Sequence, residues 1–442
     1  MLEDIKRAVD RFKQLNGEVR IVTHYDCDGI SSGAILASAM RRLDRSFRMS
    51  TIRQLEKKSL DSIKQENNKI LFLIDMGSAY LEELSKFPGN VFILDHHECI
   101  KTDLPENITF INPFLEGEES TSASQIAYLF AKELDQKNQD LASLGVLGMV
   151  GDLVDQHIGK YGDMVIKDAK DITIKKSLLL FPSTRPINKA LEFSSIYIPG
   201  VTGSAVGAMN LVREAGIKFK ENNQYKTLLD LTNEELSRLV TLVTLKRAKQ
   251  ETAIGNIYLI KFFNSIEDAR ELSSLINSCG RMGHSDVALA FCMGSKKAKA
   301  QADSIYSEYK HQLIAGLNWI SINPKIEGEG YVIINAGTSI KDSLIGTLTT
   351  ILSSSFIYPE NTIIVGMART DDKKIKVSAR IVGNSGERNL KKIIESAAHA
   401  VGGEFGGHKK AAGCFLPIEQ ESNFIEILKK ELRVNQIQVK VN

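Results

Sequence analysis

Residues 19–29, VRIVTHYDCDG, form the stretch that decides the fold, because an apolar run ends there in a histidine and two carboxylates. Two further apolar runs end in the same way: residues 71–74 lead into Asp75, and residues 91–94 lead into Asp95-His96-His97. Short apolar runs that alternate with helical patterns predict a parallel α/β sheet. The carboxyl ends of parallel strands meet at one edge of the sheet, where functional groups gather. We therefore expect these polar side chains to lie together.

The residue types at this edge predict bound cations. A further acidic segment, Gly151-Asp152-Leu153-Val154-Asp155, follows an apolar helical stretch at 141–150. Carboxylates a few ångströms apart repel each other, so some must hold a proton or share a metal ion. Oxygen and imidazole ligands without thiolates favour Mn²⁺ or Mg²⁺ over a structural zinc ion. A single Asp at a strand end is usually a cap or turn residue, but that explanation does not cover three strand ends and a His-His pair.

Four motifs, in chain order, resemble those of the DHH phosphoesterases. They are His24-x-Asp26-x-Asp28-Gly29, the single Asp75, the Asp95-His96-His97 triplet, and Asp152. Downstream, residues 402–413, GGEFGGHKKAAG, resemble the glycine-rich signature of the DHH-associated substrate domain. Residues 275–283, LINSCGRMG, resemble the segment that follows the catalytic core in RecJ-type proteins. The resemblance spans most of the chain and indicates an archaeal-type, RecJ-like single-strand exonuclease.

The resemblance implies two divalent cations, with Mn²⁺ preferred and Mg²⁺ possible, at this sheet edge. The first ion would be held by His24, Asp26 and Asp75. The second would be held by Asp28, Asp75, His96 and Asp152, so that Asp75 bridges the two. Asp95 would orient His96, because imidazole ligands generally need such a partner, and His97 would donate a hydrogen bond to the scissile phosphate.

The second domain would hold the nucleic-acid backbone. Glycines 406 and 407 let a phosphate approach the main chain, and His408 adds a side-chain donor. By resemblance Arg380 contacts the same backbone, and Arg281 can serve similarly because its planar guanidinium suits phosphate oxygens. His399, among alanines in a helical pattern, is expected to be a packed helix residue. Bacterial RecJ carries further strand-binding modules, whereas this sequence stops soon after its second domain, so 5′-end selection and DNA specificity are not implied.

The chain is expected to be an α/β protein in three parts. A parallel-sheet DHH catalytic domain at 1–170 would be joined by a mainly helical extension and connecting helix, 171–324, to a smaller α/β DHH-associated domain, 325–442. In the first part, Ser31 or Ser32 is predicted to cap one helix, and the hydroxyl-rich residues 119–124 a second.

Helices and strands after residue 294 are predicted from the spacing of apolar residues and from composition. Polar, lysine-rich residues 295–312 suggest a helix that joins two lobes. Alternation of Ile437, Val439 and Val441 favours an edge strand at the C-terminus. The remaining predicted elements are strands at 331–334, 362–365 and 375–380 and helices at 339–355 and 388–401.

Composition is that of an intracellular enzyme. The five cysteines are scattered without a CxxC pair, which predicts reduced thiols and a cytoplasmic location. No apolar run is long enough to span a membrane, and no signal peptide precedes the charged N-terminal helix pattern. The net charge is only +2, so binding of nucleic acid would depend on charge asymmetry between an acidic N-terminal half and a more basic remainder.

Three functions remain open from the sequence. The first is a metal-dependent exonuclease of single-stranded DNA or RNA, acting in replication or repair, with an interdomain cleft that excludes duplex. The second is a replication scaffold, because archaeal relatives of this type associate with the GINS complex and the eukaryotic helicase counterpart has lost catalysis. The third is an oligonucleotide or dinucleotide phosphodiesterase. The complete set of metal ligands favours the first, and the RecJ-like segment at 275–283 weighs against the third.

Overall fold

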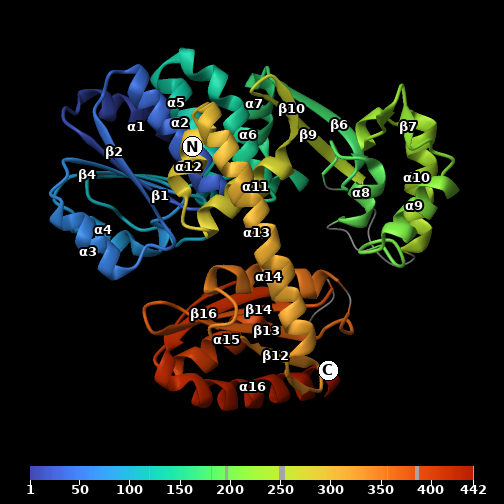
Figure 1. Ribbon diagram of the computed structural model, residues 1–442. Helices are drawn as coiled ribbons and strands as arrows, with labels where there is room; N and C mark the ends of the chain where they lie inside the picture. The colour runs from blue at the N-terminus through green and yellow to red at the C-terminus, as the bar shows by residue number, and fades with distance from the viewer. Residues whose placement is uncertain are drawn as a thin grey trace. The chain divides into compact units, whose positions relative to one another are not determined.

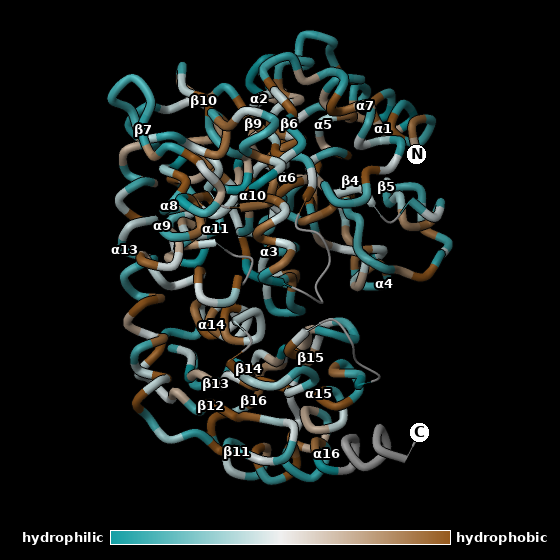
Figure 2. Tube along the Cα trace, turned by 90° about the vertical axis from the view of Figure 1, so that its right-hand side faces the viewer, coloured by the Kyte–Doolittle hydropathy of each residue, from teal (hydrophilic) through white to brown (hydrophobic). Residues whose placement is uncertain are grey.

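The computed structural model describes residues 1–118, 120–180, 182–194, 198–247, 254–355, 357–383 and 388–441, with side chains up to residue 433 (Figure 1). The chain divides into two compact units, the first comprising Met1–Ser194 and Ile198–Tyr306 and the second Ser307–Asn442. The division falls within α13 (Lys296–Ile322), along which hydrophilic and hydrophobic residues alternate (Figure 2). This helix is the polar connection expected from the sequence, although it runs on beyond residue 312. The three-part domain boundaries stay a prediction.

A five-stranded parallel sheet forms the centre of the N-terminal part, as predicted. Its strand order is β2-β1-β3-β4-β5, and each neighbouring pair is parallel. The strands are β1 (Val19–His24), β2 (Phe47–Ile52), β3 (Ile70–Ile74), β4 (Asn90–Leu94) and β5 (Ile108–Ile111).

Helices cover both faces of this sheet, which is why the strands read as continuous apolar runs. Alternate residues face opposite ways: Phe72 packs in one core cluster, and its neighbours Leu71 and Leu73 in the other. The first face carries α1 (Leu2–Gln14), α2 (Cys27–Arg42), α5 (Ala123–Leu134) and α6 (Ala142–Gly151), and the second carries α3 (Lys57–Gln65) and α4 (Leu81–Ser85) (Figure 1).

The start of α2 differs from the prediction. Asp26 is the N-cap residue, and its side chain accepts a hydrogen bond from the Gly29 N–H at 3.0 Å. Ser31 and Ser32 therefore lie inside the helix, and the prediction that either one caps it is wrong. An Asp at the N-cap satisfies the otherwise unpaired amide groups of the first turn, so the helix begins within the first motif. Ser122 caps α5 with a capping box, as the hydroxyl-rich segment predicts.

The rest of the first unit is richer in strand than expected. The prediction of a mainly helical region omits an antiparallel sheet of order β10-β9-β6. Strand β6 carries mostly exposed residues, including two lysines, so it lacks the apolar alternation that signals a strand. The elements are α7 (Lys160–Asp168), β6 (Ile172–Leu178), α8 (Ile187–Glu192), α9 (Ala205–Glu214), β7 (Lys220–Glu221), β8 (Gln224–Tyr225), α10 (Asn233–Lys246), β9 (Ile254–Phe262), β10 (Ser265–Asp268), α11 (Ala269–Arg281) and α12 (Ser285–Cys292).

The second unit is a mixed six-stranded sheet of order β11-β12-β13-β14-β16-β15. Only β12 and β13 pair in parallel; the other described pairs are antiparallel. The elements are β11 (Ile326–Gly328), β12 (Tyr331–Asn335), α14 (Asp342–Ser354), β13 (Ile363–Arg369), β14 (Lys374–Ile381), α15 (Leu390–His399), β15 (Glu404–Gly407), β16 (Ala411–Pro417) and α16 (Glu421–Val441). The strands and helices predicted between 331 and 401 are therefore confirmed.

The predicted C-terminal edge strand is wrong, because residues 421–441 form the helix α16. Phe424, Leu428 and Leu432 repeat every four residues, and all three are fully buried in the core of the second unit. This helical period outweighs the short alternation that follows it. Among the described residues, none of the helices combines the length and the apolar character required to cross a bilayer.

Candidate metal centre

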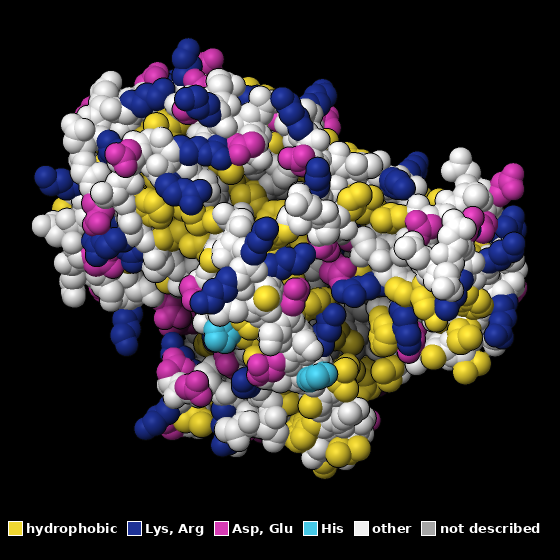
Figure 3. Space-filling model, turned by 45° about the horizontal axis from the view of Figure 1, so that its top comes forward, with side chains coloured by type: hydrophobic (Ala, Val, Ile, Leu, Met, Phe, Trp, Pro, Cys, Tyr) yellow, Lys and Arg dark blue, Asp and Glu magenta, His cyan; other side chains and the backbone are white. Residues whose placement is uncertain are grey.

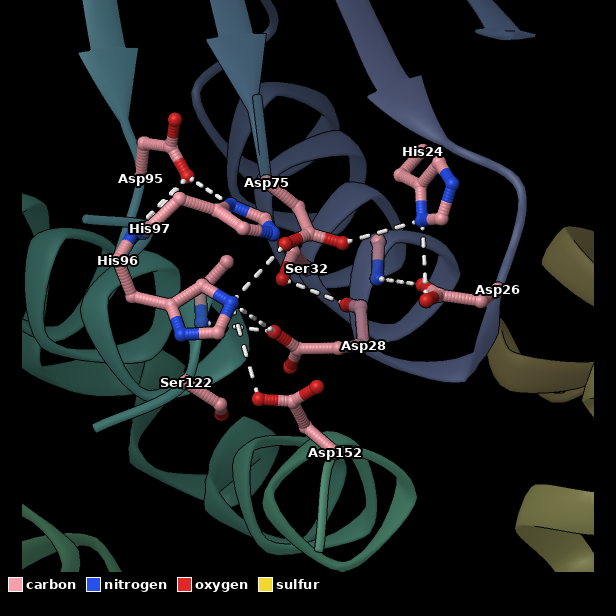
Figure 4. A network of polar contacts seen from close by, with 12 residues as sticks. His24, Asp26, Asp28, Ser32, Asp75, Asp95, His96, His97, Ser122 and Asp152 are labelled. Carbon is pink, nitrogen blue, oxygen red and sulfur yellow. Dashed lines mark hydrogen bonds and ion pairs between the residues drawn. The ribbon is translucent and has the colours of Figure 1, made fainter. Parts of the chain in front are cut away.

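The motif residues meet at the carboxyl edge of the parallel sheet. Figure 4 shows their side chains pointing toward one another from different strands and helices. His24 ends β1, and Asp26 and Asp28 lie at the start of α2. Asp75 directly follows β3, the DHH triplet follows β4, and Asp152 is the C-cap of α6. The structure thus brings together all six residues expected to bind metal.

Asp75 lies between two groups of potential ligands. On one side, His24 Nδ1 is 2.9 Å from Asp26 Oδ2 and 3.4 Å from Asp75 Oδ2. On the other, His96 Nε2 is 3.3 Å from Asp75 Oδ1, 3.7 Å from Asp152 Oδ2 and 4.0 Å from Asp28 Oδ2. The two oxygens of one carboxylate therefore face different groups, which is the arrangement a bridging ligand requires.

The backbone at Asp75 makes this position possible. Its φ is 61°, in the left-handed region that Asp tolerates better than most residues with a side chain. Its N–H still donates to the Leu94 carbonyl at 2.9 Å, so the chain turns immediately after leaving the sheet. This turn places a nearly buried carboxylate directly at the strand end.

Asp28 is held by the N-terminus of a second helix. Its Oδ2 accepts from the Ala123 N–H at 2.7 Å and its Oδ1 from the Ser124 N–H at 3.0 Å, both in the first turn of α5. A helix N-terminus favours a carboxylate because its free amide groups and the helix dipole both attract negative charge. Helix α6 approaches so closely that a Cβ on Gly148 would lie 2.5 Å from Asp28 Oδ1. Asp28 is thus fixed from two sides.

The electrostatics of the cluster show excess negative charge. Burial, followed by the charge of Asp75, raises the pKa of Asp28 to about 6. Burial, followed by the charge of Asp28, raises the pKa of Asp152 to about 7. Burial alone would lower the pKa of His96, but Asp75, Asp152 and Asp28 outweigh it and raise this pKa to about 10. Neutralising this excess negative charge therefore takes bound protons or bound cations.

These residues fit a pair of divalent cations. Three groups have ligand atoms within 4.8 Å of one another, namely His24-Asp26-Asp75, Asp28-His96-Asp152 and Asp75-His96-His97. All donors are carboxylate oxygens or imidazole nitrogens, which suit Mn²⁺ and Mg²⁺. The Cys27 thiol is fully buried, and burial raises its pKa well above the usual value, so it stays a protonated packing residue.

Asp95 contacts a different histidine from the one expected. Its Oδ1 is 2.7 Å from the Nδ1 of His97, whereas it meets His96 only through the backbone N–H, at 2.8 Å. The prediction that Asp95 orients the His96 ring is therefore wrong. An Asp readily bonds groups two residues ahead in an Asx turn, which brings the second histidine within reach. Burial is the largest influence and would raise the pKa of Asp95, but the hydrogen bond and charge of His97, together with the hydrogen bond from Ser78, outweigh it and lower this pKa.

The RecJ-like segment in α11 packs against the backbone of the first motif. Asn277 Oδ1 accepts a hydrogen bond from the Cys27 N–H at 2.9 Å. A Cβ on Gly280 would lie 2.0 Å from the Tyr25 carbonyl oxygen, so only glycine allows this close approach. Sequence reasoning did not predict these contacts, although the resemblance at 275–283 marked the segment.

A pocket of about 470 Å³ lies next to the first group of ligands. The His24 ring is 4.7 Å from the Tyr25 ring, and its Nε2 is 3.1 Å from the Arg53 carbonyl oxygen. The pocket is lined by Tyr25, Met49, Ser50, Thr51, Ile52, Arg53, Gly280, Gly283, Ser285, Asp286 and Leu289. Its size falls in the range of roughly 300–1,000 Å³ typical of small-ligand sites.

Family models match three segments of the chain. The DHH family N-terminal domain matches residues 18–149, the DHH-CID domain residues 180–257, and the DHHA1 domain residues 329–434. The chain belongs to the DHH family. Uncharacterized protein MJ0831 of Methanocaldococcus jannaschii is 28% identical to this DHH-family chain over 453 residues, 98% of this chain and 99% of that protein.

Solved structures share the fold of this DHH protein at low identity. A crystal structure of exonuclease RecJ bound to manganese gives a TM-score of 0.60 at 14% identity, over 98% of this chain and 94% of that one. CDC45 from Entamoeba histolytica gives 0.64 at 11% identity, over 98% of each chain. The fold is therefore RecJ-like.

The residues expected to bind substrate lie in both units. In the second, Arg380 pairs with Ala411 in the sheet, and Ala411 closes the β15–β16 hairpin by accepting from the His408 N–H at 2.8 Å. Arg380 thus lies at the same end of the sheet as the exposed Gly406, Gly407 and His408. Arg281 ends α11 in the first unit. On the face shown in Figure 3, Lys and Arg side chains are dispersed among Asp and Glu.

Asp155, the last residue of the acidic segment after α6, is buried and pairs with Arg270 at 2.6 Å. One minor expectation requires correction. His399 is exposed at the end of α15, where its ring meets that of Phe405 at 5.0 Å, so it is not packed inside the helix layer.

Proposed function

We propose that this DHH-family protein is a metal-dependent exonuclease of single-stranded nucleic acid. The observation that carries the proposal is the pair of ligand groups that share Asp75, next to a pocket of about 470 Å³. When bound, two divalent cations at such a site neutralise phosphate charge and lower the pKa of an attacking water. Cleavage at a chain end, rather than at internal positions, is part of the proposal through the RecJ-like fold.

The protein's own residues would bind and orient the strand. His97 is 55% exposed on its side-chain surface, and its hydrogen bond with Asp95 raises its pKa, so it is suited to donate a proton or hydrogen bond to phosphate. In the second unit, a Cβ on Gly406 would meet no atom within 4 Å, which leaves the main chain open to a phosphate. Arg380 is bonded to Ser378, Ala379 and Thr350, and these contacts would hold its guanidinium in one orientation.

Recognition through phosphates predicts little dependence on base sequence. Cleavage should weaken as salt rises, because binding releases counterions. Both DNA and RNA are expected substrates, since no reader of the 2′-hydroxyl is identified among the described residues. A replication or repair role and a cytoplasmic location are part of this proposal.

The test uses single-stranded DNA and RNA, each labelled at either end, with extensively dialysed enzyme. Stepwise loss of terminal nucleotides is expected with Mn²⁺, weaker loss with Mg²⁺, and none with EDTA. Full turnover in EDTA would overturn the metal mechanism. Cleavage of dinucleotides with no action on longer strands would favour the oligonucleotide phosphodiesterase instead.

A second candidate role is that of a GINS-binding replication scaffold. The similarity in fold to CDC45 over nearly the whole chain favours this second role. Binding of GINS can coexist with catalysis. Co-elution of the purified chain with purified GINS in size-exclusion chromatography would support this role. Separate elution at micromolar concentrations of both would argue against it.

A further inference from the structure

Asn112 ties together two loops at the metal-binding edge of the sheet. It directly follows β5 and is only 6% exposed. Its Nδ2 donates to the His97 carbonyl at 2.9 Å and to Ser78 Oγ at 3.0 Å. A buried amide that bonds two loops restricts the movement of both, because breaking either bond leaves a buried polar group unpaired.

Both loops also converge on Asp95. The Ser78 N–H donates to Asp95 Oδ2 at 2.8 Å, while Asp95 Oδ1 bonds the His97 ring at 2.7 Å. His97 is therefore held by two residues: Asp95 bonds its ring at 2.7 Å and its N–H at 3.3 Å, and Asn112 bonds its carbonyl at 2.9 Å. Since 55% of its side-chain surface is exposed, the direction of the ring depends on the backbone that carries it.

We infer that Asn112 is a positioning residue that fixes His97 in the direction from which it meets the reacting phosphate. The inference rests on the proposed function for the role of His97, but the contacts themselves do not. Neither Asn112 nor Ser78 belongs to the groups of potential metal ligands. His97 belongs to one of these groups, with Asp75 and His96, but the groups His24-Asp26-Asp75 and Asp28-His96-Asp152 do not include it. Loss of Asn112 should therefore disturb His97 and leave the cations held by the other two groups in place.

A purely structural role for Asn112 can be separated from this one. Its Oδ1 also accepts from the Phe114 N–H at 2.9 Å, which caps the short 3₁₀ helix Pro113–Glu116. Asn112→Asp keeps this acceptor and removes the Nδ2 donor, whereas Asn112→Ala removes both. A matched control is Asn107, whose Nδ2 donates to the carbonyls of Phe87 at 2.9 Å and Gly89 at 3.0 Å, at the opposite end of β5.

The experiment compares Asn112→Ala, Asn112→Asp and Asn107→Ala by kcat and KM on single-stranded DNA with Mn²⁺. Both Asn112 variants should lose about 10–100-fold in kcat, as outer-shell substitutions at metal sites typically do, with KM and Mn²⁺ content unchanged. Asn107→Ala should keep the wild-type kcat. In a His97→Ala background, Asn112→Ala should add little, because two residues that act as a unit are not additive.

Hydrogen exchange gives a readout that does not need activity. Amides of residues 95–99 should exchange faster in both Asn112 variants than in wild type or Asn107→Ala. If wild-type protein degraded no strand, the proposed function would fail, and exchange would still show whether Asn112 holds the His97 loop. The inference is overturned by unchanged exchange in this segment, or by a kcat for Asn112→Ala equal to that of Asn107→Ala.

Discussion

Gly148→Ala is expected to weaken Mn²⁺ binding while the chain stays folded. A Cβ at position 148 would lie 2.2 Å from Ser124 Oγ and 2.5 Å from Asp28 Oδ1, whereas ordinary contacts begin at 3.4 Å. Either α6 must move, or both the start of α5 and the Asp28 carboxylate must give way, by the differences of 1.2 and 0.9 Å. A displacement of about 1 Å can cost roughly 100-fold in activity. Asp28 cannot swing away freely, because two amide groups of α5 hold it. We therefore expect a loss of about 10–100-fold in Mn²⁺ affinity and in kcat.

The cost to stability should be small. Replacing a glycine inside a helix by alanine gains about 1 kcal/mol, and overpacking a core costs about 1–3 kcal/mol. The net change of about 0–2 kcal/mol is small beside the roughly 5–15 kcal/mol of a typical domain. Thermal unfolding without metal should show this directly.

Gly145→Ala is the matched control for this substitution. It lies on the same helix, and its Cβ would meet Val165 Cγ1 at 2.9 Å without approaching Asp28. Isothermal titration with Mn²⁺ and strand degradation should give wild-type values for this variant. The reasoning is refuted if Gly148→Ala binds Mn²⁺ as tightly as Gly145→Ala does.

Three further outcomes are expected. His408→Ala and Arg380→Ala should each lower kcat/KM with Mn²⁺ content unchanged by elemental analysis; loss of Mn²⁺ would show that they are not confined to substrate binding. Because the folded-state pKa values of Asp28 and Asp152, about 6 and 7, lie above the usual value of 3.8, their contribution to stability is present at low pH and lost as pH rises through those values. The metal-free protein should therefore unfold at a lower temperature at pH 8 than at pH 5, and saturating Mn²⁺ should remove this loss; a flat or opposite trend would contradict the buried carboxylate cluster. Asn277→Ala removes the acceptor at the start of α2 and should weaken Mn²⁺ binding, whereas Asn107→Ala should not; equal affinities would assign Asn277 a packing role alone.

The sheet and the ligand cluster could be predicted because the pattern of apolar runs and the polar residues that end them indicate the same structure. Runs such as 91–94 are buried on both faces, so they read as continuous apolar segments and end in polar residues. Parallel pairing then places all strand ends at one edge, and this brings His24, Asp75 and His96 together without knowledge of the loops.

Features that depend on contacts between distant segments could not be read from the sequence. The Asn277–Cys27 bond joins residues 250 positions apart, and no local pattern encodes such a pairing. The partner of Asp95 was misassigned because ring direction in adjacent histidines depends on the turn that carries them. Strand β6 does not show in the sequence because its exposed lysines interrupt the apolar–polar alternation of a strand. Helix α16 does not show at residues 437–441 because three apolar residues alternate there, whereas the helical spacing of apolar residues lies upstream, at Phe424, Leu428 and Leu432.

The most direct test of the account is the stoichiometry of Mn²⁺ and the coupling between the ions. Equilibrium dialysis with electron paramagnetic resonance should find two Mn²⁺ per wild-type chain with an exchange-coupled signal. Asp75→Asn should lose the coupling and at least one ion, because Asp75 faces both ligand groups. A single uncoupled Mn²⁺ in wild type, or a coupled pair that survives in Asp75→Asn, would contradict the shared-carboxylate centre.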